Sequence, residues 1–304
     1  MSTVTPSRAS VYELVTDRIL KLLETGAVPW RKPWSASAGF PRSLASGKTY
    51  RGINVFTLSA ASYESLYWLT FKQAQARGGN VRKGEHGFPV VFWRWPDRDD
   101  ETDAGEADAP KLSRRGPLLR YYTVFNVAQC EGIQYPLTVA APRTHTPIES
   151  CERILAGMPD RPAVDHGSAR ACYSRGLDRV SMPHPPAFVS GEAYYATLFH
   201  ELAHATGHER RLDRDTLTAS KSFGDANYSR EELVAEMGAA YLCGEAGIDC
   251  ATIDNAASYL AGWIQALRGD ARLVVIAAAQ AQKAADYALN RFAETAPVAQ
   301  AVAA

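Results

Sequence analysis

The hydrophobic positions of this chain predict one helix near its start and a largely helical second half. Ser10 and Glu13 have the spacing of a capping box, and apolar residues recur every three or four positions from there to Glu24. Gly26 then provides a helix stop. The same spacing predicts further helices over residues 70–77, 148–156, 192–207, 229–247, 255–267 and 270–292.

Short runs of aromatic and β-branched residues predict strands between these helices. Residues 88–95 and 118–129 are such runs, and we expect them to pair as a hairpin. Residues 96–117 would connect them, and because they are acidic and poor in apolar side chains we expect a flexible surface insertion. Two more short strands are predicted within residues 169–183.

This order of elements indicates an α+β protein with two domains, for which 304 residues are enough. We place a small α+β domain at residues 1–135 and a mainly helical domain at 148–293. Residues 136–147 have the composition of a linker, and residues 294–304 are expected to form a disordered tail.

Charge is distributed unequally along a chain whose 33 basic and 33 acidic residues leave no net charge. Residues 1–95 hold 13 Lys and Arg against 5 Asp and Glu, whereas residues 146–304 hold 14 against 20. A basic first half is suited to a polyanionic partner.

Cysteine usage and the lack of long apolar runs indicate where the protein works. The five cysteines are odd in number and form no CxxC motif, which favours a reducing compartment over a disulfide framework. The chain opens without an apolar signal core and has no run of 18 apolar residues. We therefore expect a soluble cytoplasmic protein without a membrane partner.

His200, Glu201 and His204 form an H-E-x-x-H motif within a predicted helix. Two histidines four residues apart lie on one helix face and reach the same metal ion. A glutamate beside the first histidine lies near the open coordination position, where it takes a proton from metal-bound water. We therefore predict that Glu201 is a general base, although a motif this short also arises by chance.

A third protein ligand is expected on the next predicted helix. Glu232 and Glu236 lie four residues apart there, and this pair resembles the arrangement of glutamate zincins. We assign Glu232 as the ligand and Glu236 as the group that orients a ligating histidine. Two alternatives stay open: His208 is the third ligand, or Glu232 closes a capping box that starts at Ser229.

Two histidines and one glutamate favour zinc and tolerate manganese. If a peptide is the substrate of such a site, residues 177–183 are a candidate edge strand on which an extended chain lies. This assignment rests only on the order of segments along the chain.

Aromatic and basic residues are interleaved in the first third of the chain, where residues 1–95 hold five of the six tryptophans. Single-stranded nucleic acid binding uses this combination, because bases stack on exposed rings and cations follow the phosphates. Trp30 and Trp34 lie in the segment VPWRKPWS with little apolar company, which favours exposure. In the alternative they pack under the first helix, and only Arg31 and Lys32 face DNA. The tryptophans expected to fill the core are Trp68, Trp93 and Trp95.

Taken together, these motifs resemble a known family. The runs PWRKPW, YRGINVF, YWLTFKQAQARGGNVRKGEHGFPVVFW and YYTVFNVAQ resemble the N-terminal domain of ArdC-type plasmid antirestriction proteins, which also occurs in TraC-type plasmid primases. The run YYATLFHELAHATGHERRL, followed by YSREELVAEMGAAYL, resembles the zincin-like metallopeptidase domain joined to it in ArdC. The resemblance covers nearly the whole chain except the acidic insertion and the tail.

The resemblance implies that the first domain binds single-stranded DNA and that the second holds a metal ion, expected to be Zn²⁺ or Mn²⁺. It also implies a bacterial, cytoplasmic protein that protects incoming plasmid DNA from host restriction during conjugation and is carried into the recipient with that DNA. The residues predicted to contact DNA are Trp30, Arg31, Lys32, Trp34, Tyr50, Arg51, Asn54, Lys72, Gln73, Arg82 and Lys83.

Two other functions compete with this one. The chain is alternatively a metallopeptidase that cleaves a specific host protein, such as a restriction subunit, with DNA binding used only for delivery. A primase accessory role ranks last, because the sequence lacks the acidic cluster and the Gly-rich phosphate loop that nucleotide chemistry uses.

Overall fold

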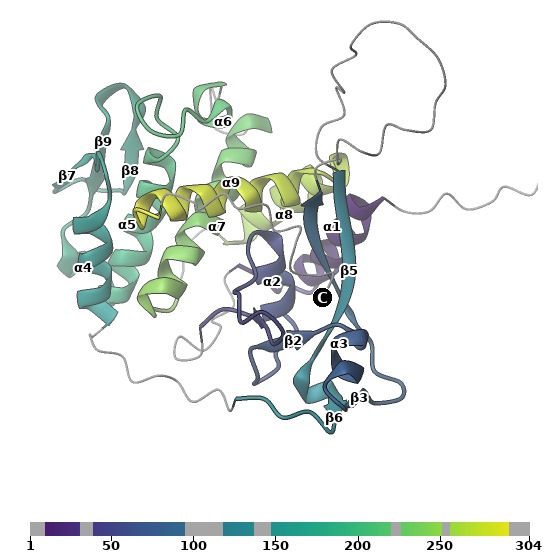
Figure 1. Ribbon diagram of the computed structural model, residues 1–304. Coiled ribbons are helices and arrows are strands. Elements are labelled where there is room, and N and C mark those ends of the chain that lie inside the picture. The colour runs from purple at the N-terminus through teal and green to yellow at the C-terminus, as the bar shows by residue number, and fades with distance from the viewer. Residues whose placement is uncertain are drawn as a thin grey trace, which may run out of the picture.

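The computed structural model describes residues 10–30, 39–94, 118–136, 147–219, 226–250 and 256–291. The acidic insertion, the tail and most of the linker therefore lie outside the described residues, and the domain boundaries stay predictions. The described part confirms the α+β class: a mixed N-terminal half precedes a helical C-terminal half with one small sheet (Figure 1). Among the described residues, no helix has both the length and the apolar character to cross a membrane.

Helix α1 (Val11–Glu24) confirms the first predicted helix and its capping box. The Ser10 hydroxyl accepts a hydrogen bond from the Glu13 N–H, and the Glu13 carboxylate accepts one from the Ser10 N–H. The buried face of α1, with Ile19 and Leu23 at its centre, packs against two helices from the far end of the chain, α8 (Ala256–Gly269) and α9 (Leu273–Ala288).

A four-stranded sheet in the order β1-β2-β5-β4 organises the N-terminal half. The predicted hairpin strands pair antiparallel, with Val90 opposite Tyr122. A second, two-stranded sheet lies beside it. The strand bounds are β1 (Arg42–Ser43), β2 (Tyr67–Leu69), β4 (Phe88–Arg94) and β5 (Leu118–Asn126) in the first sheet, and β3 (Asn80–Val81) and β6 (Cys130–Glu131) in the second.

Helix α2 (Ile53–Ser59) was not predicted, because it is short and nearly all of it is buried, so no polar face marks its period. It lies between the edge strand β4 and helix α9. The Asn54 side chain donates to the Val91 carbonyl and accepts from the Val91 N–H, each at 2.8 Å. This pair of bonds replaces a neighbouring strand at the open edge of the sheet.

Helix α3 (Phe71–Ala76) confirms the short helix predicted after Thr70. Its capping box joins Thr70 and Gln73 through two hydrogen bonds, in which each side chain accepts from the other residue's backbone N–H.

The C-terminal half confirms the predicted helices and adds a third strand to the two expected. The small sheet has the order β7-β9-β8, so β9 pairs with β7 on one side and with β8 on the other. Residues 177–183 contain β9, and the interpretation of this segment as an edge strand is therefore wrong. The bounds are α4 (Pro147–Gly157), β7 (Ala163–His166), β8 (Cys172–Ser174), β9 (Arg179–Met182), α5 (Gly191–Ala205), α6 (Asp215–Ala219) and α7 (Ala226–Ala246).

One hydrophobic core extends through both halves. Helix α9 connects them, because it contacts α1 and α2 of the N-terminal half and α5 and α7 of the C-terminal half (Figure 1). Trp30 is fully buried and packs edge-on against Trp263 of α8, with ring centroids 5.3 Å apart, and also against Phe56 of α2. The Thr16 hydroxyl donates to the carbonyl of Ala271 at the other end of the chain.

Candidate metal centre

Helix α5 places the H-E-x-x-H motif in the interior of the C-terminal half. Ser190 caps the helix by accepting a hydrogen bond from the Ala193 N–H. The flanking residues are apolar and buried, so the helix is covered by α7 and the small sheet. His200, Glu201 and His204 are 6%, 8% and 9% exposed, which rules out a chance motif on a surface helix.

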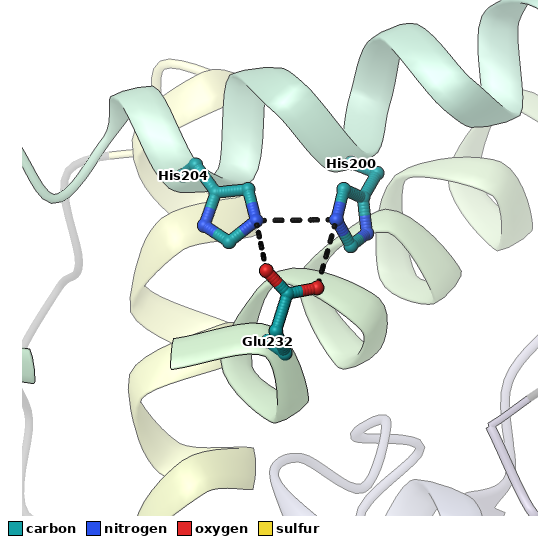
Figure 2. Close-up of side chains that lie close together, drawn as sticks. All are labelled: His200, His204 and Glu232. Carbon is teal, nitrogen blue, oxygen red and sulfur yellow. Dashed lines mark hydrogen bonds and ion pairs between the residues drawn. The ribbon is translucent and has the colours of Figure 1, made fainter. Parts of the chain in front are cut away.

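Glu232 of helix α7 faces the two histidines. Figure 2 shows both imidazoles reaching from α5 toward a carboxylate that reaches back from α7. The two Nε2 atoms are 3.1 Å apart, and the Glu232 oxygens lie 3.5 Å from the His200 Nε2 and 3.4 Å from the His204 Nε2. These three residues form the one cluster among the described residues that could hold a metal ion.

The spacing of these atoms fits a divalent metal. Tetrahedral Zn²⁺ with ligands at about 2.0–2.1 Å places neighbouring ligand atoms about 3.3 Å apart. The separation of 3.1 Å between the two Nε2 atoms lies close to this value. Each Nε2 also has one Glu232 oxygen at 3.4 or 3.5 Å, a different oxygen in each case. Two imidazole nitrogens and a carboxylate are also the donor set of hydrolytic zinc sites, which keep a fourth position open. The residues therefore fit the zinc or manganese ion that was predicted.

Glu231 orients His204 from the opposite side of the ring. Its carboxylate lies 3.2 Å from the His204 Nδ1, so that nitrogen carries the proton and Nε2 keeps its lone pair for the metal. The Arg214 guanidinium donates to both Glu231 oxygens and also to the Ala203 carbonyl near the end of α5. The Thr216 hydroxyl adds a further hydrogen bond to Glu231.

Glu236 was predicted to orient a ligating histidine, but in the structure Glu231 is the residue that orients His204. Glu236 is buried one turn further along α7, but Glu231 occupies the Nδ1 side of His204. The Nδ1 of His200 has no hydrogen-bond partner, so Glu236 does not orient that ring through a hydrogen bond at Nδ1 either. The sequence analysis missed Glu231 because the glutamate-zincin pattern places the orienting acid four residues after the ligand. In this chain the orienting acid is the residue directly before the ligand.

Two open alternatives for the third ligand are also settled. His208 is buried, but its Nδ1 accepts a hydrogen bond from the Arg210 N–H, and it lies outside the metal-binding cluster. Ser229 lies inside α7, which begins at Ala226, so Glu232 does not close a capping box from Ser229.

The electrostatics of the cluster favour a cation. Burial alone would raise the pKa of Glu231, but Arg214 and His204 outweigh it and lower the pKa to about 2. Burial opposes ionisation of Glu232 as well, yet the two histidines hold its pKa below the usual range. Burial alone would lower the pKa of His204, but the two carboxylates raise it to about 10. At neutral pH these shifts leave His204 protonated, so His204 and Arg214 together balance the two carboxylates while no metal is bound. A divalent metal would take the place of the proton on the His204 Nε2.

The predicted DNA-contacting residues are divided between the surface and the core. Trp30 and Asn54 are buried, at 0% and 9% exposed. The prediction that Trp30 stacks on bases is therefore wrong, because Trp263 and Phe56 already cover its ring. Asn54 is engaged with the edge of β4, so it is a structural residue rather than a DNA contact.

The other described members lie nearer the surface. Gln73 is half-buried and its side chain completes the cap of α3, which is a structural role. Tyr50 is half-buried and hydrogen-bonded to Tyr122. The exposed ones are Arg51, Lys72, Arg82 and Lys83, and the remaining predicted contacts, Arg31, Lys32 and Trp34, lie outside the described residues.

The tryptophans expected to fill the core differ from one another. Trp68 is buried, as predicted, whereas Trp93 is 41% exposed and its ring lies tilted against that of Tyr12, with centroids 6.4 Å apart. Trp95 lies outside the described residues.

Two families match the chain in its two halves. Residues 9–125 match the N-terminal domain of anti-restriction factor ArdC, and residues 150–280 match a zincin-like metallopeptidase. The metal-free crystal structure of the antirestriction ArdC protein from plasmid R388 is 36% identical, with a TM-score of 0.73 over 93% of this chain and 98% of that one. The Mn(II)-bound structure of the same protein matches with a TM-score of 0.72.

Sequence relatives extend the comparison. Protein y4eC of Sinorhizobium fredii, which is uncharacterized, is 39% identical over 91% of both chains. DNA primase TraC of Escherichia coli is 36% identical over 293 residues, although this chain spans 20% of the length of that protein. Because the R388 protein and y4eC match over nearly their whole lengths, this chain belongs to the ArdC family of antirestriction proteins.

Proposed function

We propose that this protein binds single-stranded DNA without sequence preference and protects incoming plasmid DNA from host restriction during conjugation. The observation that carries the proposal is the match to the ArdC protein of plasmid R388 over 93% of this chain. In that match the N-terminal domain of ArdC and the zincin-like half occur together, as they do here.

Exposed rings and cations on the N-terminal half support DNA binding. Phe71, Trp93 and Tyr121 are 44%, 41% and 47% exposed, which leaves their faces open to unstacked bases. Lys72 follows Phe71 directly at the start of α3, and the exposed Arg82 and Lys83 lie in the turn after β3, which packs against that helix. Side chains of this kind follow a phosphate backbone without reading its sequence.

The metal would be held by His200, His204 and Glu232 in the C-terminal half. When bound, such an ion polarises a coordinated oxygen and lowers the pKa of coordinated water. Glu231, held by Arg214, fixes the tautomer and position of His204. Glu201 follows His200 directly in the H-E-x-x-H motif and would hold a proton beside the open coordination position.

Transfer of a plasmid into a restricting host tests the function. We expect the full chain to raise the yield of transconjugants in a restricting recipient and to leave it unchanged in a non-restricting one. Glu201→Gln is compared in the same assay, with binding to a labelled oligonucleotide as a second measurement.

The Glu201→Gln variant separates DNA binding from metal chemistry. We expect its affinity for single strands to equal that of the wild type. If Glu201→Gln and a fragment of residues 1–145 both protect, DNA binding is sufficient for protection. If Glu201→Gln binds DNA but fails to protect, the zincin-like site acts on a further substrate. No protection by the wild type would contradict the proposed function.

A further inference from the structure

A cavity of about 470 Å³ lies between the two halves of the molecule. Its N-terminal wall is the segment from Gly47 to Arg51, together with Phe40. Its C-terminal wall comes from the end of α7 and the last turns of α9, and Arg291 follows α9 at the rim. A volume of this size is in the range of small-ligand sites.

Hydrogen bonds between the halves hold the cavity open in a defined shape. The Tyr241 hydroxyl donates to the Gly52 carbonyl at 2.8 Å, and the Gly52 N–H donates to the Gln282 Oε1 at 3.2 Å. Arg51 forms an ion pair with Asp286 of α9. Arg51 and Gly52, directly before α2, are therefore fixed to α7 and α9 by three contacts.

The cavity combines aromatic walls with excess positive charge. Phe40 and Tyr241 are in edge contact, with ring centroids 6.3 Å apart, and Tyr50 adds a third ring to the lining. The cations Lys48, Arg51 and Arg291 also line it.

Carboxylates balance only part of this charge. Arg291 makes two hydrogen bonds with Glu245, at 2.7 and 2.8 Å, while Asp286 pairs with Arg51. Three cations against two carboxylates leave the cavity cationic. The guanidinium groups of Arg51 and Arg291 stay accessible, with side chains 56% and 54% exposed, and each keeps N–H donors for an anion.

We propose that this cavity accepts one unstacked nucleotide of a bound single strand, with the base among the rings and the phosphate at Lys48, Arg51 and Arg291. A planar aromatic group joined to an anion is the ligand chemistry that matches these walls. Exposed Gly47, Lys48 and Thr49 leave the cavity accessible from the N-terminal surface. The inference rests on the proposed function, and it adds that the C-terminal half contributes to DNA binding.

Charge-matched variants of the full chain test the inference. Lys48→Ala with Arg291→Gln removes two cations from the cavity. The control, Lys283→Ala with Arg268→Gln, removes two cations outside the cavity. It is matched because Arg268 pairs with one glutamate, Glu24, as Arg291 pairs with Glu245. Fluorescence anisotropy with labelled oligothymidylate at one salt concentration measures the affinity, after circular dichroism has shown that each variant is folded.

We expect the cavity variant to raise Kd about tenfold, because it removes two of the three cations assigned to the phosphate, and the control to raise it about twofold or less. Equal weakening of both variants would overturn the inference while leaving DNA binding intact. No binding by the wild type would instead contradict the proposed function itself.

Photocrosslinking of the wild type gives a second, mutation-free test. An oligothymidylate with one 5-iodouracil is expected to crosslink to Phe40 or Tyr50, because this base reacts with aromatic rings that it contacts. Crosslinks found only elsewhere would overturn the inference. Free thymidine monophosphate at a saturating concentration is added as a competitor. If it abolishes the crosslink while the Kd of the oligonucleotide is unchanged, the cavity binds free nucleotides and its assignment to a strand-bound nucleotide is wrong.

Discussion

At the scale of single residues, two adjacent glutamates act on the same histidine from opposite sides. Glu232 lies at the His204 Nε2 and Glu231 at its Nδ1. Their roles differ because Glu231 is also held by Arg214 and Thr216, whereas Glu232 faces only the two histidine nitrogens in the cluster.

Glu231→Gln should weaken metal binding by about 10- to 100-fold, the usual effect of removing a group that orients a ligand. The amide loses the charge that fixes the Nδ1 proton and leaves Arg214 without its carboxylate. Competition with a chromogenic chelator measures the affinity for Zn²⁺ or Mn²⁺. Glu209→Gln, on the exposed segment after α5, is the control. Unchanged metal affinity in Glu231→Gln would show that Glu231 serves only the fold.

Asn54→Ala should destabilise the protein by about 2–4 kcal/mol, because it leaves the N–H and carbonyl of buried Val91 without partners. Urea denaturation measures this loss, and Asn80→Ala at an exposed strand position should change stability by no more than about 0.5 kcal/mol. The folded variant should keep its affinity for single strands. Loss of that affinity in a folded variant would show that Asn54 contacts DNA.

At the scale of elements, Arg211 joins the metal-binding helix to the small sheet. Its guanidinium donates to the Ala205 carbonyl at the end of α5, to both oxygens of Asp178 before β9, and to the Asp160 carbonyl before β7. The Tyr173 hydroxyl of β8 also donates to Asp178. Position 178 has a φ of 46°, which aspartate tolerates better than most residues.

Asp178→Asn should cost about 3 kcal/mol at neutral pH, because it leaves the buried Arg211 guanidinium without its charge partner. Partial burial would raise the pKa of Asp178, but bonds from Arg211 and Tyr173 outweigh it and hold the pKa below the usual range. A lowered carboxyl pKa contributes stability above its unfolded value and loses it as pH falls through the folded value.

The difference between wild type and Asp178→Asn should therefore shrink below about pH 4. Thermal denaturation from pH 3 to pH 7 measures it. Asp165→Asn breaks the exposed pair with Arg179, so it should change stability by less than about 1 kcal/mol at any pH. A pH-independent difference for Asp178→Asn would contradict the ion-pair explanation.

At the scale of the whole molecule, the shared core makes the two halves stabilise each other. Trp30 from the N-terminal half is enclosed by Trp263 and Phe56, and α1 lies against α8 and α9. The half that we propose to bind DNA and the half that contains the candidate metal site share one core, so we expect them to unfold together.

Trp263→Ala should destabilise the full chain by about 3–5 kcal/mol and leave a single unfolding transition for both halves. Urea denaturation followed by circular dichroism and by tryptophan fluorescence measures this, since five tryptophans lie in the first half. A fragment of residues 1–145 should unfold at lower urea than the full chain, because it lacks the partners of α1 and Trp30. A fragment as stable as the full chain would show that the halves are independent.

Local sequence patterns predicted most helices and the hairpin, because a capping box or a run of alternating residues acts over a few positions. Ser10 and Thr70 show this, as each begins the helix that its spacing predicted. The H-E-x-x-H spacing likewise predicted two ligands, since four residues on a helix fix their relative direction.

The sequence by itself thus determined the α+β class and the family resemblance, and it predicted that His200, His204 and Glu232 belong to one candidate metal site, where the structure brings them together. Only the tertiary structure decided that Glu231 rather than Glu236 orients His204, that Trp30 is a core residue, and that Tyr50 and Arg51 line a cavity completed by α7 and α9. These outcomes depend on which distant segments cover a side chain. Contacts between residues more than 200 positions apart, such as Trp30 with Trp263, leave no periodic trace in the chain.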